Sequence, residues 1–479
     1  MNYRMVARIL GLVLLSFAAL MLLPLLTAAI YGESVRGFAI AAPVTALAGG
    51  LLLCLRPKSR DLYAREGFVA VGLAWVLMGL FGALPFVLSG DIPSFEGALF
   101  ETISGLTTTG ATVLTDIEAM SRAGLFWRSF LEWLGGMGIL IFIMAVLPMG
   151  GEHSLHIMRA ELPGPTVGKL VPRAGDTAKI LYLIYGGLSV AELILLMLGG
   201  MSFYEALLHT FATAGTGGYS IKNLGIAAYN SVYIELVIAS FLVLFGINFN
   251  LYYFVIIGRV RDALKSEELH WYFGIIIAST LCIAINILGM CRSFAEALRH
   301  AFFNTVSIMT TAAFSTVDTM QWPGFSRFIL VMLMLTGGCA GSTAGGVKVS
   351  RVLLLFKTAG TDIARVLHPR EVRRVEMDGK RVDAATTKAV YCYFFLYVVI
   401  ILASTLIFSL DGHDMTTNFT AAISCISNIG PSLALISQTH SYTAFSTLSH
   451  IVMMIVMLLG RLEIYPLLVL MSPSLYKRR

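Results

Sequence analysis

Charged residues are scarce in this sequence. Asp, Glu, Lys and Arg make up 13% of its 479 residues, about half the share found in a soluble globular domain. No polar stretch is long enough to form a separate soluble domain. Hydrophobic residues reach 57%, and apolar runs of about 20 residues, each able to cross a bilayer core of roughly 30 Å, recur from end to end. The sequence therefore predicts an integral membrane protein.

Clusters of reactive or metal-binding side chains are also missing. The six cysteines show no metal-ligand spacing and no C-x-x-C pair, which favours small buried hydrophobic side chains. The nine histidines form no H-E-x-x-H or similar motif. An intramembrane enzyme needs a nucleophile, a base or a metal gathered at one depth. Because no such constellation is visible, we expect no enzymatic activity and no organic cofactor.

A cleavable secretion signal is not expected either. Arg4 and Arg8 precede an apolar run from Ile9 to Ile30. This run is longer than the ~7–15 residues of a signal peptide, and no small-x-small cleavage site follows it. We expect an uncleaved first membrane helix.

Apolar runs and basic residues together predict the topology. Ten spans are expected, near residues 7–30, 38–55, 67–89, 124–149, 178–201, 228–258, 270–290, 325–356, 386–410 and 446–472. The segments on one side of the membrane then hold most of the 34 Lys and Arg residues. By the positive-inside rule that side is cytoplasmic and contains both termini. Topology explains the basic loops, so we expect no nucleic-acid partner.

Four stretches of the chain can be aligned without a gap: Glu101–Thr112, His209–Ser220, Asn304–Ser315 and Ala421–Ser432. One column holds Gly110, Gly218, Ala313 and Gly430, and two places later come Thr112, Ser220, Ser315 and Ser432. Each stretch closes a short amphipathic segment that allows only about 10–16 helical residues, too few to cross the bilayer. A re-entrant half-helix followed by an extended return fits this length. The alternative is four interfacial helices whose glycines form ordinary turns.

Non-helical backbone at membrane depth must be buried in protein or line a watery cavity, so four such returns are expected to share one axis. We predict an all-α membrane protein with ten transmembrane spans and four re-entrant pore helices around one pore. The expected units are two leading helices at 1–60 and pore repeats at 61–165, 166–265, 266–365 and 366–479.

The composition of the four loops favours an alkali cation. A ring of backbone carbonyls can replace the hydration shell of such an ion without adding charge. Glycine permits left-handed backbone where carbonyls must turn inward, and the hydroxyls of Thr108, Thr109 and Thr112 can add oxygen ligands or brace the loop. Helix C-termini pointing at the axis also favour a cation. The loops offer no carboxylate of the kind that divalent ions prefer.

Six motifs carry a resemblance to a known family: Thr107–Thr112, Trp133–Gly138, Gly215–Ser220, Gly337–Lys348, Asn428–Ser432 and Leu459–Glu463. Through them the sequence resembles the TrkH family, the membrane subunits of bacterial Trk potassium uptake systems, within the Trk/Ktr/HKT superfamily. The resemblance covers essentially the whole chain. It implies repeats of helix, pore helix and helix around a potassium filter, in a homodimer of the bacterial inner membrane. It also implies a cytosolic nucleotide-binding regulatory partner of TrkA type.

Carried over position by position, the resemblance implies a K⁺-binding filter of four triplets. They are Thr108, Thr109 and Gly110; Thr216, Gly217 and Gly218; Thr311, Ala312 and Ala313; and Asn428, Ile429 and Gly430. Ala313 departs from the family pattern, which has a third filter glycine there. Since a β-carbon penalises left-handed backbone, the third loop is either distorted or never needs a positive φ. Strict preference for K⁺ over Na⁺ is therefore open.

Five glycines interrupt the span 325–356: Gly337, Gly338, Gly341, Gly345 and Gly346. Each costs a helix about 1 kcal/mol relative to alanine, so helix is not expected to persist. A phosphate-binding loop is disfavoured because Val347 stands where that motif requires lysine. A close helix–helix contact is one alternative. We favour an intramembrane gate beneath the filter, as the resemblance also implies.

Arg461 is predicted to lie deep in the last span. A charge at that depth is costly and points to a function, and neither interface is within comfortable reach of its side chain. Glu463 faces another side of a continuous helix, although a structural salt bridge remains an alternative. We expect Arg461 to reach the pore below the filter, where it holds the glycine segment or forms an electrostatic barrier.

The sequence thus predicts inward movement of K⁺ through one pore per subunit. Ion-coupled symport with H⁺ or Na⁺, or a less selective K⁺/Na⁺ pathway, are the alternatives. A basic stretch on the cytoplasmic side is explained mostly by topology and is also a candidate docking site for a regulator. It contains Arg365, Arg370, Arg373, Arg374, Lys380 and Arg381.

Overall fold

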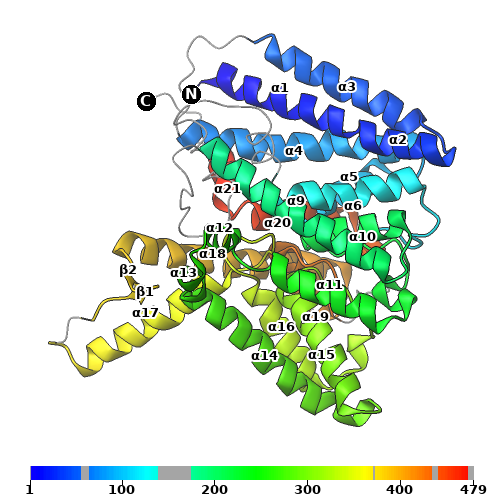
Figure 1. The fold of residues 1–479 in the computed structure, drawn as a ribbon. Helices are drawn as coiled ribbons and strands as arrows, with labels where there is room; N and C mark the ends of the chain where they lie inside the picture. The colour runs from blue at the N-terminus through cyan, green and yellow to red at the C-terminus, as the bar shows by residue number, and fades with distance from the viewer. Residues whose placement is uncertain (1, 56–63, 139–173, 371–372, 434–440, 473–479) are drawn as a thin grey trace.

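The computed structural model describes residues 2–55, 64–138, 174–370, 373–433 and 441–472. This part of the chain is almost entirely helical (Figure 1), and its one sheet is a two-stranded antiparallel hairpin of β1 (Glu376–Met377) and β2 (Lys380–Arg381). The leading helices are α1 (Tyr3–Leu20), α2 (Leu22–Tyr31) and α3 (Arg36–Leu53). Helices α1 and α3 pack closely because Gly11 and Gly49 face each other, so that a β-carbon on either would stand within 3 Å of the other's carbonyl oxygen.

Nine helices of 13 to 26 residues form the scaffold of the described chain. They are α4 (Ala64–Ser89), α6 (Arg122–Met137), α9 (Ala174–Leu198), α11 (Val232–Phe245), α14 (Glu267–Ile287), α16 (Gly324–Thr336), α17 (Val349–Leu367), α18 (Ala384–Phe408) and α20 (Thr447–Arg461). The short connecting helices are α12 (Phe249–Ile256), α13 (Val260–Leu264) and α21 (Tyr465–Met471).

Six of the described helical segments are long and apolar enough to cross a membrane, or seven if the bent pair α11 and α12 is one span. The expected span at 228–258 is that bent pair, turned through 89°. Side chains such as Phe395, Leu402 and Leu406 on α18 are largely exposed, as expected for a face covered by lipid rather than water. The fold is therefore that of a helical membrane protein. Much of the expected span 124–149 lies outside the described residues.

Two further expected spans are also broken. The span 325–356 divides into α16 and α17 around a non-helical segment, as its glycines predicted. The span 446–472 divides into α20 and α21, which corrects the expectation of one continuous helix. At the break Glu463 and Ile464 both adopt positive φ, 54° and 69°, a conformation that L-residues do not take inside a right-handed helix.

Four short helices each lead into one of the four aligned loops: α5 (Phe95–Leu106), α10 (Phe203–Gly215), α15 (Phe294–Met309) and α19 (Met415–Ser427). Each is started by a side-chain cap, in which Ser94, Ser202, Ser293 or Asp414 accepts a hydrogen bond from a first-turn amide. With 12 to 16 residues, they are roughly 18–24 Å long, shorter than a bilayer core.

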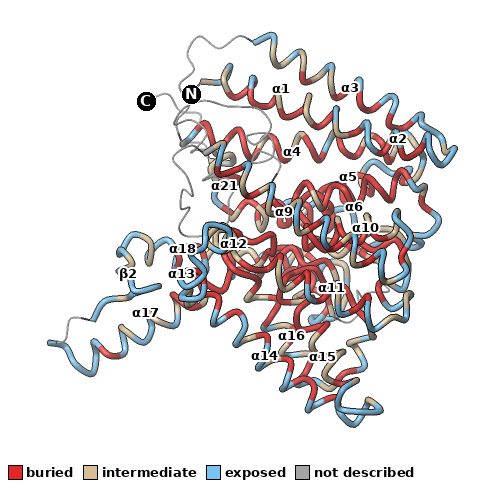
Figure 2. Tube along the Cα trace, in the orientation of Figure 1, coloured by how far each residue is buried: buried red, intermediate tan, exposed pale blue. Residues whose placement is uncertain are grey.

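These four helices form a closed ring with their neighbours. Within each unit this helix packs between the preceding and the following scaffold helix: α4 and α6 around α5, α9 and α11 around α10, α14 and α16 around α15, and α18 and α20 around α19. The following helix also contacts the next unit's short helix, through the pairs α6–α10, α11–α15, α16–α19 and finally α20–α5. Figure 2 shows the buried residues concentrated at this centre and the exposed ones on the outer helices.

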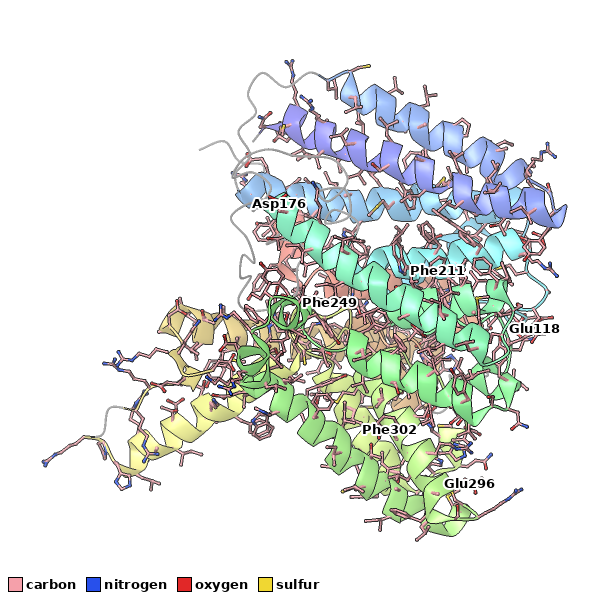
Figure 3. The ribbon with its side chains drawn as sticks, viewed as in Figure 1. Glu118, Asp176, Phe211, Phe249, Glu296 and Phe302 are labelled. Atoms are coloured by element: carbon pink, nitrogen blue, oxygen red, sulfur yellow. The ribbon has the colours of Figure 1, made fainter. Side chains whose placement is uncertain are left out.

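The two ends of the molecule are distinct. Figure 3 shows Asp176, at the start of α9, at one end, and Glu118 and Glu296 at the opposite end. The N-terminus and the hairpin lie at the same end as Asp176 (Figure 1).

Candidate ion pathway

The loop after each short helix has the same backbone conformation. Two positions in every loop, two residues apart, adopt positive φ. They are Thr108 (54°) and Gly110 (75°), Thr216 (55°) and Gly218 (85°), Thr311 (62°) and Ala313 (49°), and Asn428 (56°) and Gly430 (99°). Ala313 therefore takes the left-handed conformation despite its β-carbon. The third loop keeps the conformation of the other three, and the idea that it never needs a positive φ is wrong.

The loops also meet edge to edge. A β-carbon added at Gly110 would collide with the carbonyl oxygen of Gly217, and one at Gly218 with that of Ala312. One at Gly430 would collide with the carbonyl oxygen of Thr109. The structure thus brings the first loop against the second and fourth, and the second against the third.

The third and fourth loops are joined through the glycine-rich segment. The amide of Gly345 donates to Oγ1 of Thr311 over 2.7 Å, and the amide of Gly346 donates to the carbonyl of Ser427 over 3.0 Å. All four loops containing the predicted filter residues therefore converge on one region. The interpretation of four separate interfacial turns does not fit this arrangement.

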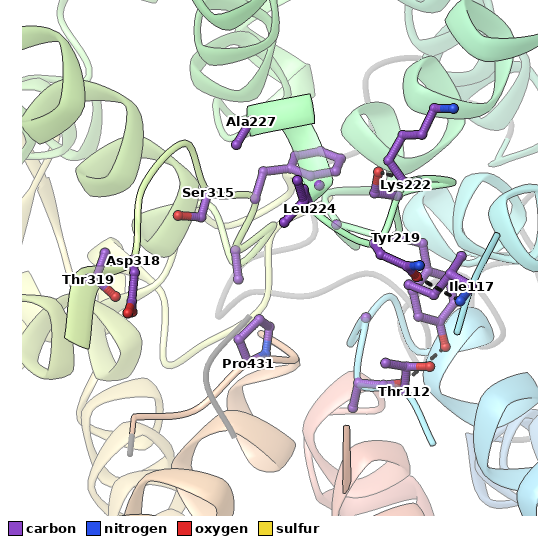
Figure 4. A pocket seen from close by; sticks show the side chains of 18 of the residues that line it. Thr112, Ile117, Tyr219, Lys222, Leu224, Ala227, Ser315, Asp318, Thr319 and Pro431 are labelled. Carbon is purple, nitrogen blue, oxygen red and sulfur yellow. Dashed lines mark hydrogen bonds between the residues drawn. The ribbon is translucent and has the colours of Figure 1, made fainter. Parts of the chain in front are cut away.

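A pocket of about 270 Å³ opens on the side of the loops away from the glycine-rich segment. Gly110, Gly218, Ala313 and Pro431 each contribute to its lining, one from each loop. Figure 4 shows Thr112, Tyr219, Ser315 and Pro431 around it. Near its rim, the side chain of Asn223 donates to Asp116 over 2.8 Å, and this hydrogen bond lowers the pKa of Asp116. An ionised carboxylate there favours the approach of cations.

A repeated hydrogen bond braces three of the loops. Thr112 donates to Glu101 over 3.0 Å, Ser220 pairs with the ring of His209 over 3.3 Å, and Ser315 donates to Asn304 over 3.3 Å. Each bond joins the same two columns of the sequence alignment. The fourth loop has Ala421 in the first column and lacks a polar side chain for it. The hydroxyl column was recognised in the sequence, but its bracing partners were not.

A buried ion pair supports the first two loops. Nε of Arg128 lies 2.5 Å from the carboxylate of Glu101, and the two side chains are 2% and 0% exposed. Arg128 also donates to the carbonyl of Ser220 over 3.2 Å, and its guanidinium stacks 3.3 Å above the ring of Tyr219. The amide of Tyr219 donates in turn to the buried carboxylate of Glu132 over 3.2 Å.

Sequence reasoning missed this cluster, although a signal was present. An arginine inside an apolar span is costly unless it is paired, and Arg128 lies in the expected span 124–149 just as Arg461 lies in the last one. The loops carry no carboxylate of their own, yet Glu101 and Glu132 lie directly behind them.

The glycine-rich segment, residues 337–348, lies between α16 and α17. The amide of Cys339 donates to the carbonyl of Gly246, and the amide of Phe249 donates to the carbonyl of Gly341, each over 3.0 Å. The segment is thus attached to the bend between α11 and α12. Of its five glycines, Gly337, Gly341 and Gly346 adopt positive φ. Gly338 and Gly345 have no room for a β-carbon, which would meet Ala344 and the carbonyl of Ser427.

Arg461 is the last residue of α20. Its guanidinium donates to the carbonyl of Thr343 over 2.9 Å and to that of Gly135 over 2.6 Å, and it also donates to the carbonyl of Gly136. Arg461 therefore joins the glycine-rich segment to the end of α6. Glu463 turns away and pairs with Arg351 of α17 over 2.6 Å.

Replacing Ala313 by glycine is expected to sharpen ion selectivity. Left-handed backbone costs a residue with a β-carbon about 1–2 kcal/mol, and this strain lies in the ring of loops. We expect the ratio of K⁺ to Na⁺ flux in vesicles to rise by about twofold or more as that strain is relieved. Ala312→Gly is the matched control, because Ala312 is not among the left-handed residues. An unchanged ratio in Ala313→Gly would show that the alanine has no effect on selectivity.

A ring of matched, oxygen-rich loops inside a helical membrane scaffold defines a cation transport protein. The sequence agrees with this class of protein, because residues 35–477 match the model of the TrkH family, which is described as a cation transport protein. The chain belongs to the TrkH family. It is 35% identical to the Trk system potassium uptake protein TrkH of Escherichia coli (strain K12), over 100% of both chains. It is 33% identical to the Trk system potassium uptake protein TrkG of the same organism, over 98% of both.

A solved structure agrees with the fold. The crystal structure of the potassium transporter TrkH from Vibrio parahaemolyticus matches with a TM-score of 0.89 and 32% identity, over 100% of both chains. These relatives are ion transporters, and the protein is a transporter rather than an enzyme.

Proposed function

We propose that this protein takes up potassium ions across the bacterial inner membrane through one pore lined by the four loops. The observation that carries the proposal is the pair of left-handed positions in every loop, at residues whose backbones meet. Left-handed residues let an extended chain turn its carbonyls to one side, as a carbonyl-lined filter requires. The relatives named as potassium uptake proteins support K⁺ as the ion. The proposed filter is the set of four triplets that the family resemblance implies, which begin at Thr108, Thr216, Thr311 and Asn428.

The proposed architecture is ten spans with four re-entrant helices, α5, α10, α15 and α19, and both termini in the cytoplasm. The five units begin at residues 1, 61, 166, 266 and 366. Contacts of each short helix with its flanking helices and with the next unit support this division. The family resemblance supports a homodimer of such subunits.

The glycine-rich segment is the proposed gate. It contacts Thr311 and Ser427 at the end of the loops opposite the pocket, so an ion leaving the filter on that side must pass it. Gly337, Gly338, Gly341, Gly345 and Gly346 shape the segment, and Arg461 holds it through the carbonyl of Thr343.

Rubidium uptake into vesicles containing the purified protein tests the function. We expect uptake that K⁺ competes away and Na⁺ inhibits weakly. Gly218→Ala is expected to abolish it, because a β-carbon there collides with the carbonyl of Ala312. Gly274→Ala is the matched control, since open space surrounds Gly274 on α14. Absence of rubidium uptake by folded protein would refute the proposal.

The same vesicles distinguish conduction from symport. Conduction predicts rubidium entry that needs no gradient of H⁺ or Na⁺ and moves neither ion. Entry that carries H⁺ or Na⁺ inward in a constant ratio would favour the coupled mechanism instead.

The proposed partner is a cytosolic nucleotide-binding subunit of TrkA type, which docks on the basic stretch from Arg365 to Arg381. Arg373 and Arg374, shortly before the hairpin, and Lys380 and Arg381, in its strand β2, are exposed. Changing these four residues to glutamine is expected to weaken capture of the subunit by about tenfold or more, because electrostatic docking scales with complementary charge. Arg261 and Lys265, which are also exposed, supply the control double substitution to glutamine. Equal capture by both variants would exclude this docking site.

A further inference from the structure

Two adjacent glutamates at the start of α14 make different contacts. Glu268 is 6% exposed, and one of its oxygens, Oε1, accepts from two amides. One is the amide of Ala340 at 2.7 Å, and the other is the amide of Ser350 at 3.0 Å. Ala340 lies in the middle of the glycine-rich segment, and Ser350 lies in the first turn of α17. A single oxygen thus ties the middle of the segment to the helix that follows it.

This contact replaces a missing helix cap. Lys348 precedes α17 and makes no side-chain capping bond, so the first amides of α17 depend on other partners. A carboxylate at a helix N-terminus is also favoured by the helix dipole. Glu268 therefore caps α17 from a helix more than eighty residues earlier in the chain.

Glu267, the preceding residue, makes a second cap with the β1–β2 hairpin. Ser266 precedes α14 without a side-chain capping bond. Instead the amide of Glu267 donates to Oδ1 of Asp378 over 2.7 Å, and the amide of Asp378 donates back to Glu267 over 3.2 Å. Asp378 lies at the turn of the hairpin, with φ of 52°.

Lys357 of α17 contacts both α14 and the hairpin. Its ammonium pairs with the carboxylate of Glu267 and donates to the carbonyl of Glu376 in the hairpin over 2.8 Å. The hairpin, α14 and α17 are therefore joined by four polar contacts at the end of the molecule where the hairpin lies (Figure 1). One residue further along α14 is the glutamate that holds the glycine-rich segment.

We propose that the β1–β2 hairpin is a latch for the gate, with Asp378 and Glu268 as positioning residues that act in series. Asp378 fixes the first turn of α14, and that turn presents Glu268 to the glycine-rich segment. Drawing the hairpin away releases Glu268 and frees the segment. This inference rests on the proposed gate and adds the element through which a cytoplasmic event reaches it.

Flux measurements on four variants test whether the two residues act in series. Asp378→Ala is expected to raise rubidium flux without any regulatory subunit by about fivefold, the change in population that one lost hydrogen bond produces. Glu268→Ala is expected to raise it at least as much. The double variant is expected to match Glu268→Ala alone, since the second residue of a series adds nothing once the first is lost. Glu268→Gln keeps the acceptor oxygen and is expected to restore most of the closed state.

The matched control is Asp362→Ala on α17. Asp362 is exposed and pairs with Arg365 of the same helix over 3.1 Å, so its loss is expected to leave flux unchanged. Hydrogen exchange supplies a second readout, in which Asp378→Ala should speed exchange at Ala340 and Ser350 while that of α1 and α3 stays the same.

Two results would overturn the latch. One is unchanged flux and unchanged exchange in Asp378→Ala, and the other is flux changes of the two single variants that multiply in the double variant. Deletion of Cys339–Ala344 separates this inference from the gate itself. If the deletion raises flux and Asp378→Ala does not, the gate stands and the latch is wrong. If the deletion lowers flux in folded protein, the gate proposal fails.

Discussion

Replacing Arg128 by methionine is expected to lower the free energy of unfolding by about 3–5 kcal/mol and to abolish selective uptake. The substitution leaves the carboxylate of Glu101, which is fully buried, without its ion partner, and breaking one half of a buried pair costs about that much. It also removes the donor to the carbonyl of Ser220 and the cation above Tyr219. Thermal unfolding in detergent and rubidium uptake measure the two effects.

A double-mutant cycle supplies the control. Removing both charges, as Glu101→Gln with Arg128→Met, is expected to recover part of the lost stability, because no unpaired charge remains. Arg128→Lys keeps the positive charge but loses the planar guanidinium, so its free energy of unfolding should lie between those of the wild type and Arg128→Met. If Arg128→Met is as stable as wild type, the pair does not support the loops.

Replacing Arg461 by glutamine is expected to raise rubidium flux by about tenfold. The guanidinium donates to three carbonyls on two elements, and charge-assisted hydrogen bonds contribute about 1.5–3 kcal/mol each. Losing even one such bond frees the glycine-rich segment by enough for a tenfold change in population. The substitution also removes a positive charge from the region below the loops, which lowers the barrier to a cation.

Arg461→Lys separates the two causes. Lysine keeps the charge but cannot span three carbonyls with a fork. If attachment of the segment dominates, Arg461→Lys should raise rubidium flux as much as Arg461→Gln does. If the electrostatic barrier dominates, the flux of Arg461→Lys should stay at the wild-type level. Flux at or below wild type in folded Arg461→Gln would contradict both mechanisms.

Much of the candidate site could be predicted because its signals are local. The glycine column marks where left-handed backbone is needed, and the structure places positive φ at Gly110, Gly218 and Gly430. It also places positive φ at Ala313, where the residue type argues against it. There the surrounding loop overrides the preference of the side chain.

Other features could not be read from local pattern. The expected continuous last helix breaks after Arg461, because Glu463 turns toward Arg351, a partner 112 residues away. The bracing role of Glu101 depends on its ion pair with Arg128. The sequence pattern shows only that Arg128 lies in an apolar span, not which residue it pairs with. Glu268 looks like an ordinary acidic residue at a helix start until its contacts with Ala340 and Ser350 are seen.

The sequence by itself determined the membrane class, the fourfold repeat and the left-handed positions that carry glycine. Hydropathy, helix length, glycine and hydroxyl spacing are properties of a residue and its near neighbours, so they survive in a linear pattern. Only the tertiary structure decided the order of the ring, the attachment of the glycine-rich segment and the partners of its buried charges. Arg461, for example, meets Gly135 across 326 residues. Such contacts depend on which faces of distant helices pack together, and no local preference encodes that choice.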